Sequence, residues 1–173
     1  MRRAPLLGAA LLLAAAPAGA AEFARTEGFA GYSYARFADH GFHGWTAGLT
    51  YNVSHRLGFE FEGAGHSGTV DGTDLSRLSF LAGPRLSLRG GGAVPFARLL
   101  AGVLRTSSGI TVQNVSIAAR ATDAAGAAGL GLDLSLGRRF GLRLTGDYFV
   151  VRADGETQGD PRAAIGVRYR LGP

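Results

Sequence analysis

Large apolar side chains alternate with small or polar ones along most of this chain. In residues 129–152, leucines at every second position flank a Gly-Arg-Arg break, with Leu130, Leu132 and Leu134 before it and Leu142 and Leu144 after it. Successive side chains of a strand point to opposite faces of a sheet, so this period of two predicts a β-hairpin. The pattern alone leaves the wet face open, because a soluble ligand-binding barrel would turn the leucines inward and a membrane barrel would turn them outward.

The same alternation recurs in segments separated by stretches rich in glycine, aspartate or serine. The breaks after the second, fourth and sixth segments are short, whereas the others are mostly longer. Short turns at one end and longer loops at the other, with strands of about ten residues, are typical of transmembrane β-barrels. We predict eight strands over residues 28–37, 44–53, 57–66, 75–88, 94–106, 122–136, 140–152 and 161–171, and longer loops at 38–43, 67–74, 107–121 and 153–160.

Parity separates two kinds of side chain in most of these segments. In the third, Leu57, Phe59 and Phe61 share one face, while Glu60 and Glu62 share the other. The second face carries mostly glycine, serine, threonine and charges of both signs, which suit the interior of an eight-stranded barrel because that space is only wide enough for side chains to fill. The apolar face then contacts lipid, where an open sheet edge is not viable. We therefore predict an all-β fold, an eight-stranded antiparallel up-and-down transmembrane β-barrel.

The inward parity also selects a set of charged residues. Buried charges must be paired or they cost several kcal/mol each, so we predict a structural salt-bridge network that plugs the lumen. A general acid/base pair or an ion-conducting lumen is the alternative. The predicted network residues are Glu60, Glu62, Arg77, Arg85, Arg98, Asp133, Arg143, Asp147, Arg168 and Arg170. The candidates for aromatic girdles at the two membrane interfaces are Tyr32, Tyr34, Trp45, Tyr51, Tyr148 and Tyr169.

Composition removes several chemistries. Charged residues are 18% of the chain, below the roughly one quarter that is usual for soluble domains. All 18 basic residues are arginines, spread without a basic cluster, so nucleic-acid binding has no footprint. The absence of cysteine excludes disulfides, thiolate zinc sites and thiol nucleophiles. We expect no cofactor and no metal site, since His40 and His43 beside Asp39 form only a weak candidate.

The first residues resemble an export signal. Arg2 and Arg3 precede an apolar run, residues 4–17, which is followed by the small residues Ala18-Gly19-Ala20 that a signal peptidase accepts. The run is shorter than the ~20 residues that a helical span needs. We predict a cleaved signal peptide over 1–20 and a barrel domain over 21–173.

Several short motifs, in their order along the chain, resemble the small outer-membrane β-barrel proteins of Gram-negative bacteria, the OmpA-like and OmpX-like eight-stranded barrels. The resemblance covers 21–173 and implies a place in the cell outer membrane, contact with lipid and lipopolysaccharide, and biogenesis through periplasmic chaperones and the barrel-assembly machinery. That machinery usually reads a C-terminal aromatic residue, whereas this chain ends Leu171-Gly172-Pro173 with Tyr169 nearby. The motifs are GYSY (31–34), GW (44–45), GPR (83–85), PFA (95–97), GLGLDLSL (129–136), DY (147–148), Arg162 and IGVRYRLG (165–172).

Four functions are compared on this basis. We expect a non-enzymatic outer-membrane barrel with a structural or surface-contact role, in which the loops, especially 107–121, meet an extracellular partner that the sequence does not identify. A lipid A-modifying barrel enzyme would carry a His-x-Ser pair, but His66 and Ser67 are adjacent. A soluble lipocalin-like carrier, suggested by Gly44-Trp45 and GDYF (146–149), requires the leucines inside. A small passive pore needs a bore that eight strands hardly leave.

Overall fold

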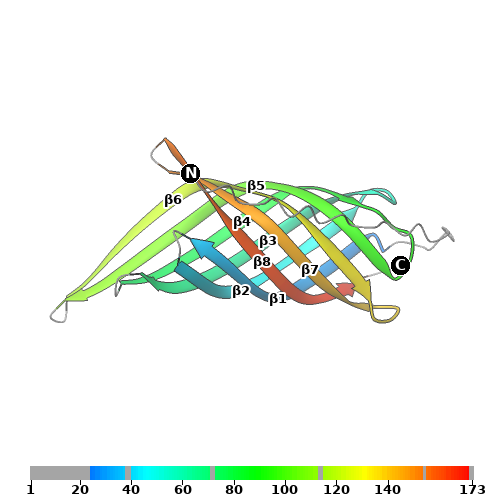
Figure 1. The fold of residues 1–173 in the computed structure, drawn as a ribbon, viewed down its shortest axis with the longest axis horizontal. Coiled ribbons are helices and arrows are strands. Elements are labelled where there is room, and N and C mark those ends of the chain that lie inside the picture. The colour runs from blue at the N-terminus through cyan, green and yellow to red at the C-terminus, as the bar shows by residue number, and fades with distance from the viewer. Residues whose placement is uncertain (1–23, 38–39, 71–72, 113–114, 154, 172–173) are drawn as a thin grey trace, which may run out of the picture.

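The structure is a computed structural model that describes residues 24–37, 40–70, 73–112, 115–153 and 155–171. Its strands form one closed antiparallel barrel in sequence order, and β8 pairs with β1 to close it (Figure 1). The predicted fold class is therefore confirmed. The predicted signal peptide, 1–20, lies outside the described residues. The strands are β1 (Thr26–Phe37), β2 (His40–Asn52), β3 (Leu57–Val70), β4 (Thr73–Ser87), β5 (Ala93–Val112), β6 (Val115–Ser135), β7 (Phe140–Ala153) and β8 (Glu156–Arg170).

The connections β2–β3, β4–β5 and β6–β7 are short and lie at one end of the barrel, which we call the turn end. Backbone hydrogen bonds close them, for example from Val53 N to Leu57 O at 2.9 Å and from Leu136 N to Phe140 O at 3.0 Å. The connections β1–β2, β3–β4, β5–β6 and β7–β8 lie at the opposite end, the loop end. Both chain termini of the barrel, at Thr26 and Arg170, are at the turn end, as an even number of strands requires.

The strands extend further at the loop end than the predicted boundaries. The predicted loop 107–121 is wrong in its main part, because β5 and β6 pair with each other as far as Val112 and Val115. Parts of the loops predicted at 38–43, 67–74 and 153–160 are likewise strand, since β2, β4 and β8 begin at His40, Thr73 and Glu156. Beyond the part of the wall that carries large outward apolar side chains, neither face needs to be hydrophobic, so the alternation fades while the hydrogen-bond ladder continues. Figure 1 shows the β5–β6 hairpin reaching past its neighbours.

Two inward-facing strand glycines lie where the backbone of the neighbouring strand leaves no room for a side chain. A Cβ added to Gly44 would overlap the carbonyl oxygen of Gly65 on β3, and one added to Gly83 would overlap that of Leu99 on β5. Glycine in a strand interior costs stability unless something approaches the backbone this closely. Here the neighbouring strand itself makes the approach.

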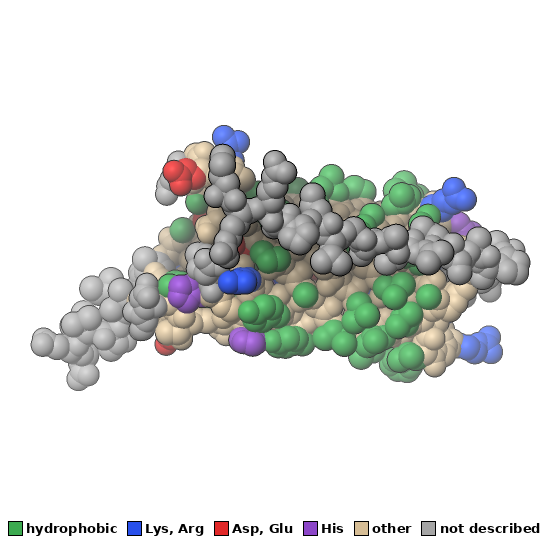
Figure 2. Space-filling model, in the orientation of Figure 1, with side chains coloured by type: hydrophobic (Ala, Val, Ile, Leu, Met, Phe, Trp, Pro, Cys, Tyr) green, Lys and Arg blue, Asp and Glu red, His purple; other side chains and the backbone are tan. Residues whose placement is uncertain are grey.

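The outer surface of the barrel is apolar. Leu130 is 69% exposed, whereas Asp133 and Arg143 are 1% and 2% exposed, so the predicted assignment of the two faces is confirmed for this hairpin. Hydrophobic side chains gather along the visible face of the molecule (Figure 2). We call this surface the apolar belt; its exposed members include Leu49, Phe59, Phe61, Phe80, Leu86, Leu99, Val103, Leu130, Leu144, Ile165 and Val167.

No described helix is long and apolar enough to cross a membrane.

Candidate functional site

The turn end and the middle of the barrel interior hold a connected set of arginines and carboxylates, which we call the ion-pair network. Every member is buried, and members on strands that are not neighbours contact one another across the lumen. The network consists of Glu27, Glu60, Glu62, Arg85, Arg98, Asp133, Arg143, Asp147, Arg162 and Arg168.

Asp133 on β6 is the centre of the layer nearer the turn end. Arg85 donates from Nη2 to Asp133 Oδ2 at 2.5 Å, and Arg143 donates from Nε to Asp133 Oδ1 at 2.8 Å. Arg85 also reaches Glu60 Oε2 at 3.2 Å, which joins β4 to its neighbour β3. Because β4 and β6 are separated by β5, the Arg85–Asp133 pair crosses the interior rather than following the wall.

Arg98 on β5 is the centre of the second layer. Its Nε and Nη2 donate to the two carboxylate oxygens of Asp147 at 2.9 and 2.5 Å, the two-pronged geometry that makes arginine–carboxylate pairs specific. Its Nη1 donates to Glu60 and, at 2.7 Å, to Glu62. Arg162 on β8 pairs with Glu62 at 2.6 Å and with Asp147 at 3.0 Å. Four strands, β3, β5, β7 and β8, thus meet at one charged layer.

Two inward phenylalanines flank the arginines of the first layer. The guanidinium carbon of Arg85 lies 3.6 Å from the ring centroid of Phe96, and that of Arg143 lies 4.5 Å from the centroid of Phe29. An arginine over an aromatic face is stabilised by the ring quadrupole, more strongly when both are desolvated. The rings therefore support the charged layer as well as filling space.

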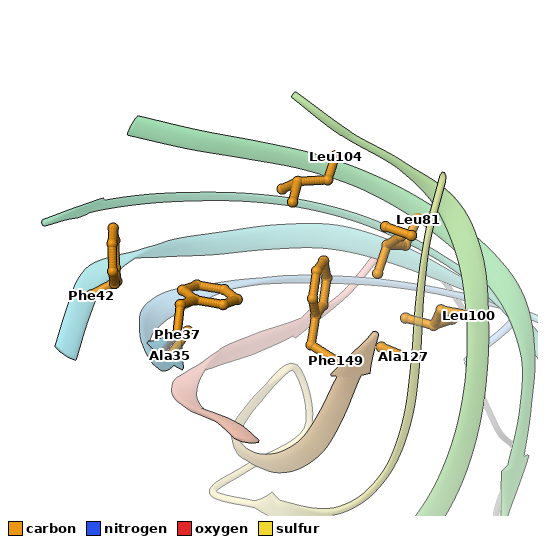
Figure 3. Close-up of a cluster of buried hydrophobic side chains, with 9 residues drawn as sticks. Ala35, Phe37, Phe42, Leu81, Leu100, Leu104, Ala127 and Phe149 are labelled. Atoms are coloured by element: carbon orange, nitrogen blue, oxygen red, sulfur yellow. The ribbon is translucent and has the colours of Figure 1, made fainter. Parts of the chain in front are cut away.

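The loop half of the interior is filled by hydrophobic side chains, which we call the apolar cluster (Figure 3). The rings of Phe37 and Phe149 meet edge to face, with centroids 6.1 Å apart. The expectation that the inward face carries mostly small and charged residues is wrong for this half of the lumen. Apolar side chains fill a lumen without needing partners, so parity fixes their direction but not their chemistry. The cluster comprises Ala35, Phe37, Phe42, Leu81, Leu100, Leu104, Ala125, Ala127 and Phe149.

Two of the ten predicted network residues are placed elsewhere. The guanidinium carbon of Arg77 lies over the ring of Phe37, 4.2 Å from its centroid, beside the apolar cluster. Arg170 is half-buried at the turn end, where it donates to the carbonyl oxygen of Arg138 at 3.2 Å and to Ser135 Oγ at 3.1 Å. Within the described part of the chain, neither arginine lies within 4.0 Å of a carboxylate oxygen. The remaining eight lie together.

Glu27 and Arg162 belong to the network but were absent from the predicted set. Arg168 Nη1 donates to Glu27 Oε1 at 2.6 Å, which pairs the first and last strands across the closure of the barrel. Both missed residues have a signal in the sequence: Arg162 shares the parity of Arg168 along β8, and Glu27 precedes the alternating part of β1 by one residue.

The six aromatic girdle candidates fall into two groups along the barrel. Five are exposed on the outer face, and Tyr169 is half-buried against Phe140, with ring centroids 5.0 Å apart. Trp45 covers a glycine of the next strand, because a Cβ built on Gly65 would lie 2.6 Å from the indole nitrogen. Tyr51 and Tyr169 lie towards the turn end, and Tyr32, Tyr34, Trp45 and Tyr148 towards the loop end.

His66 points into the lumen, where its Nε2 lies 2.9 Å from Ser33 Oγ, both side chains being buried. Its neighbour Ser67 faces outward and is exposed, so the adjacent His-Ser pair of the sequence lies on opposite faces of β3. The His66 ring also meets the ring of Phe37 edge to face, with centroids 6.2 Å apart. A hydrolytic triad orients its histidine with a carboxylate, and the polar partner of His66 among the described residues is the Ser33 hydroxyl. Within the described ranges, no group of three His, Cys, Asp or Glu side chains could hold a metal ion.

Comparison with known proteins gives the fold a context. No family model and no curated protein sequence matches the chain. Among solved structures, Ail, the attachment invasion locus protein of Yersinia pestis, is 17% identical with a TM-score of 0.65, covering 86% of this chain and 99% of Ail. Neisserial surface protein A is 13% identical with a TM-score of 0.65, covering 84% of this chain and 96% of that protein. The outer membrane protein OprG of Pseudomonas aeruginosa is 15% identical with a TM-score of 0.57, covering 87% and 97%.

At these identities the comparison speaks for the fold alone, and it agrees with the closed eight-stranded topology. The chain has the fold of the small eight-stranded outer-membrane β-barrels.

Proposed function

We propose that this chain is a non-enzymatic outer-membrane protein, exported by its N-terminal signal peptide, whose barrel is anchored by the apolar belt and whose loop-end hairpins make contacts outside the cell. The observation that carries the proposal is the inverted distribution of side chains. Large hydrophobic residues such as Leu130 and Phe61 are more than half exposed, while ten charged residues are buried inside. Water would penalise that outer surface, whereas lipid hydrocarbon matches it.

The same inversion argues against a soluble carrier. A lipocalin-like barrel would need the leucines of 129–144 around a ligand and Arg85, Asp133 and Arg143 in water. The observed burial of those three charged side chains is the reverse. In water, a carrier with this exposed apolar belt would aggregate, since soluble monomers rarely present apolar patches of more than a few hundred Å².

The ion-pair network and the apolar cluster support a structural role for the lumen. Together they place interlocking side chains through both halves of the interior, which favours a rigid plug over a conducting pathway. Planar-bilayer recording checks this part of the proposal: we expect no stable conductance steps. Regular ion-selective steps would instead favour the passive pore.

The β5–β6 pair supports the surface-contact role, because these two strands extend past the other strands at the loop end (Figure 1). The similar structure of Ail belongs to a protein named for attachment and invasion, and Ail has been crystallised with the heparin analogue sucrose octasulfate. By this analogy we propose that the loop end of this chain contacts surface polyanions or lipopolysaccharide. Its biogenesis would use periplasmic chaperones and the barrel-assembly machinery.

The experiment that tests membrane anchoring compares two arginine substitutions in the full chain, expressed with its own signal sequence. Phe61→Arg places a charge on the apolar belt and should destabilise insertion by about 2–4 kcal/mol, the cost of arginine near the bilayer midplane. Gly137→Arg is the matched control, since a side chain at this turn position meets nothing within 4 Å.

Sucrose-gradient fractionation and the heat-dependent gel shift of folded barrels are the readouts. We expect the wild type and the control in the outer-membrane fraction and a depleted Phe61→Arg variant. A chain that folds and stays soluble without detergent would contradict the proposal.

A further inference from the structure

A shallow depression lies on the outer face of β4, β5 and β6, towards the loop end. Its volume is about 350 Å³, and the side chains that line it are two arginines, two serines and a leucine. All five positions have outward parity, so the depression belongs to the membrane-facing side of the wall and not to the lumen. The lining residues are Ser76, Leu78, Arg105, Ser107 and Arg120.

The strand register fixes how these side chains are arranged. Arg105 pairs with Leu78 on one side, and Ser107 pairs with Ser76 on β4 and with Arg120 on β6. The two arginines are therefore diagonal neighbours on adjacent strands, about 7–8 Å apart at the backbone, and Ser107 is next to both of them. Both arginine side chains are exposed. Two guanidinium groups on one tetrahedral anion is an arrangement that arginine geometry favours.

The depression begins where the apolar belt ends. Phe80 and Val103 pair with each other and are 57% and 46% exposed. Arg105 is two residues beyond Val103 in the same strand, which is about 7 Å of rise. A molecule whose acyl chains lie against Phe80 and Val103 would hold its headgroup at Arg105 and Arg120. The carboxylate next along β4, Asp74, accepts a hydrogen bond from Thr69 Oγ1 at 2.9 Å and lies on the far side from the belt.

We propose that this depression, the arginine notch, binds the sugar phosphate of a phosphorylated glycolipid in the leaflet around the loop end. Arg105 and Arg120 bind the phosphate, Ser76 and Ser107 donate to its oxygens or to sugar hydroxyls, and Leu78 packs against the sugar or the first acyl carbons. The inference rests on the proposed function, in which the loop end contacts surface polyanions or lipopolysaccharide; it chooses the membrane glycolipid and assigns it a site.

The test uses the folded barrel in nanodiscs of a zwitterionic phospholipid, titrated with diphosphorylated lipid A, its dephosphorylated form, or soluble sucrose octasulfate. Native mass spectrometry counts the bound molecules. The test variant is the double substitution R105Q/R120Q, and the matched control is R138Q/R139Q, an exposed arginine pair in the β6–β7 turn.

We expect the wild type and the control to retain diphosphorylated lipid A, and R105Q/R120Q to lose affinity roughly tenfold or more, because two charge-assisted contacts are removed. Dephosphorylated lipid A should bind all three proteins equally weakly. If R105Q/R120Q binds diphosphorylated lipid A as tightly as the wild type, the proposed notch is wrong. It is also wrong if R138Q/R139Q loses as much affinity as R105Q/R120Q. Binding of sucrose octasulfate but not of lipid A through Arg105 and Arg120 overturns the glycolipid and identifies a soluble polyanion. A barrel that fails to enter the discs overturns the proposed function and the notch together, whereas insertion with unchanged affinity overturns the notch alone.

Discussion

The two halves of the barrel interior solve the same packing problem with opposite chemistry. Towards the turn end, Asp133 and Arg98 are centres of a network in which every charge has a partner on another strand. Towards the loop end, side chains such as Leu100 and Phe149 fill the space by van der Waals contact alone. The wall around both halves is the same continuous ladder of backbone hydrogen bonds.

The two halves should differ in how much stability they lose when a side chain is substituted. A buried ion pair contributes little net stability relative to a hydrophobic replacement, but removing one partner leaves an uncompensated charge. An apolar cluster loses only the contacts of the atoms removed, plus the cavity they leave. A single substitution in the charged half should therefore cause a large loss of stability, whereas in the apolar half the loss should grow with the number of atoms removed.

The largest effect should follow from Arg98→Leu. The change leaves Glu60, Glu62 and Asp147 without their shared arginine. We expect a loss of about 4 kcal/mol in the free energy of unfolding, within the range for breaking a buried ion pair. Urea titration in lipid vesicles, followed by the heat-dependent gel shift, measures it. The control Arg138→Leu changes an exposed arginine of a turn, and an equal loss there would contradict the ion-pair explanation.

The next effect should come from Leu100→Ala in the apolar cluster. Leu100 is 2% exposed, so truncation opens a cavity, and we expect a loss of about 3 kcal/mol. Its neighbour Leu99 is on the outer face, 62% exposed, where lipid can fill the gap. The same unfolding titration compares the two. The assignment of faces on β5 is wrong if Leu99→Ala is the more damaging change.

Arg77→Met compares the same residue type in the two halves. Arg77 lies over Phe37 beside the apolar cluster, and methionine keeps most of its length. We expect a loss of about 1 kcal/mol, the scale of one cation–π contact, and so well below that of Arg98→Leu. If Arg77→Met and Arg98→Leu lowered the free energy of unfolding equally, the distinction between a charged and an apolar half of the lumen would be wrong.

The smallest effect should be that of Leu81→Met, which conserves volume inside the apolar cluster. Leu81 is buried, and because a volume-conserving swap of this kind usually stays below about 1.5 kcal/mol, we expect a loss of only about 0.5 kcal/mol, less than that of Arg77→Met. The gel shift of the folded form should persist at the wild-type temperature within a few degrees. If this small change abolished folding, the loop half would be as sensitive to substitution as the ion-pair network.

Sequence alone predicted the closed barrel because alternation is a local property of each strand. It placed Asp133 and Arg143 inside for the same reason, since direction depends only on parity. It could not predict that Arg85 meets Asp133 on β6 rather than Asp147 on β7, because that choice depends on how β4, β6 and β7 are shifted relative to one another around the closed wall. Parity gave Arg77 an inward direction but did not predict its contact with Phe37, and it did not show that apolar residues such as Leu81 dominate the loop half.

The strand ends were the least predictable part of the fold. Hydrophobic alternation marks where the wall meets the apolar belt, and it ends near Val103 on β5 although the strand continues to Val112. The hydrogen bonds of the β5–β6 hairpin need no particular side chains. A ladder without an alternating pattern looks like a loop in the sequence.

The chain contains one tryptophan, Trp45, which lies on the outer face of β2 over Gly65. All tryptophan fluorescence of the protein therefore comes from one known place on the loop half of the barrel. Its emission should shift to the blue as β2 and β3 assemble within the bilayer, and lipids brominated at different acyl carbons should quench it according to depth. The fluorescence of Trp45 therefore reports the membrane depth of the loop half, and its change with time measures how fast this half crosses the membrane, without any added label.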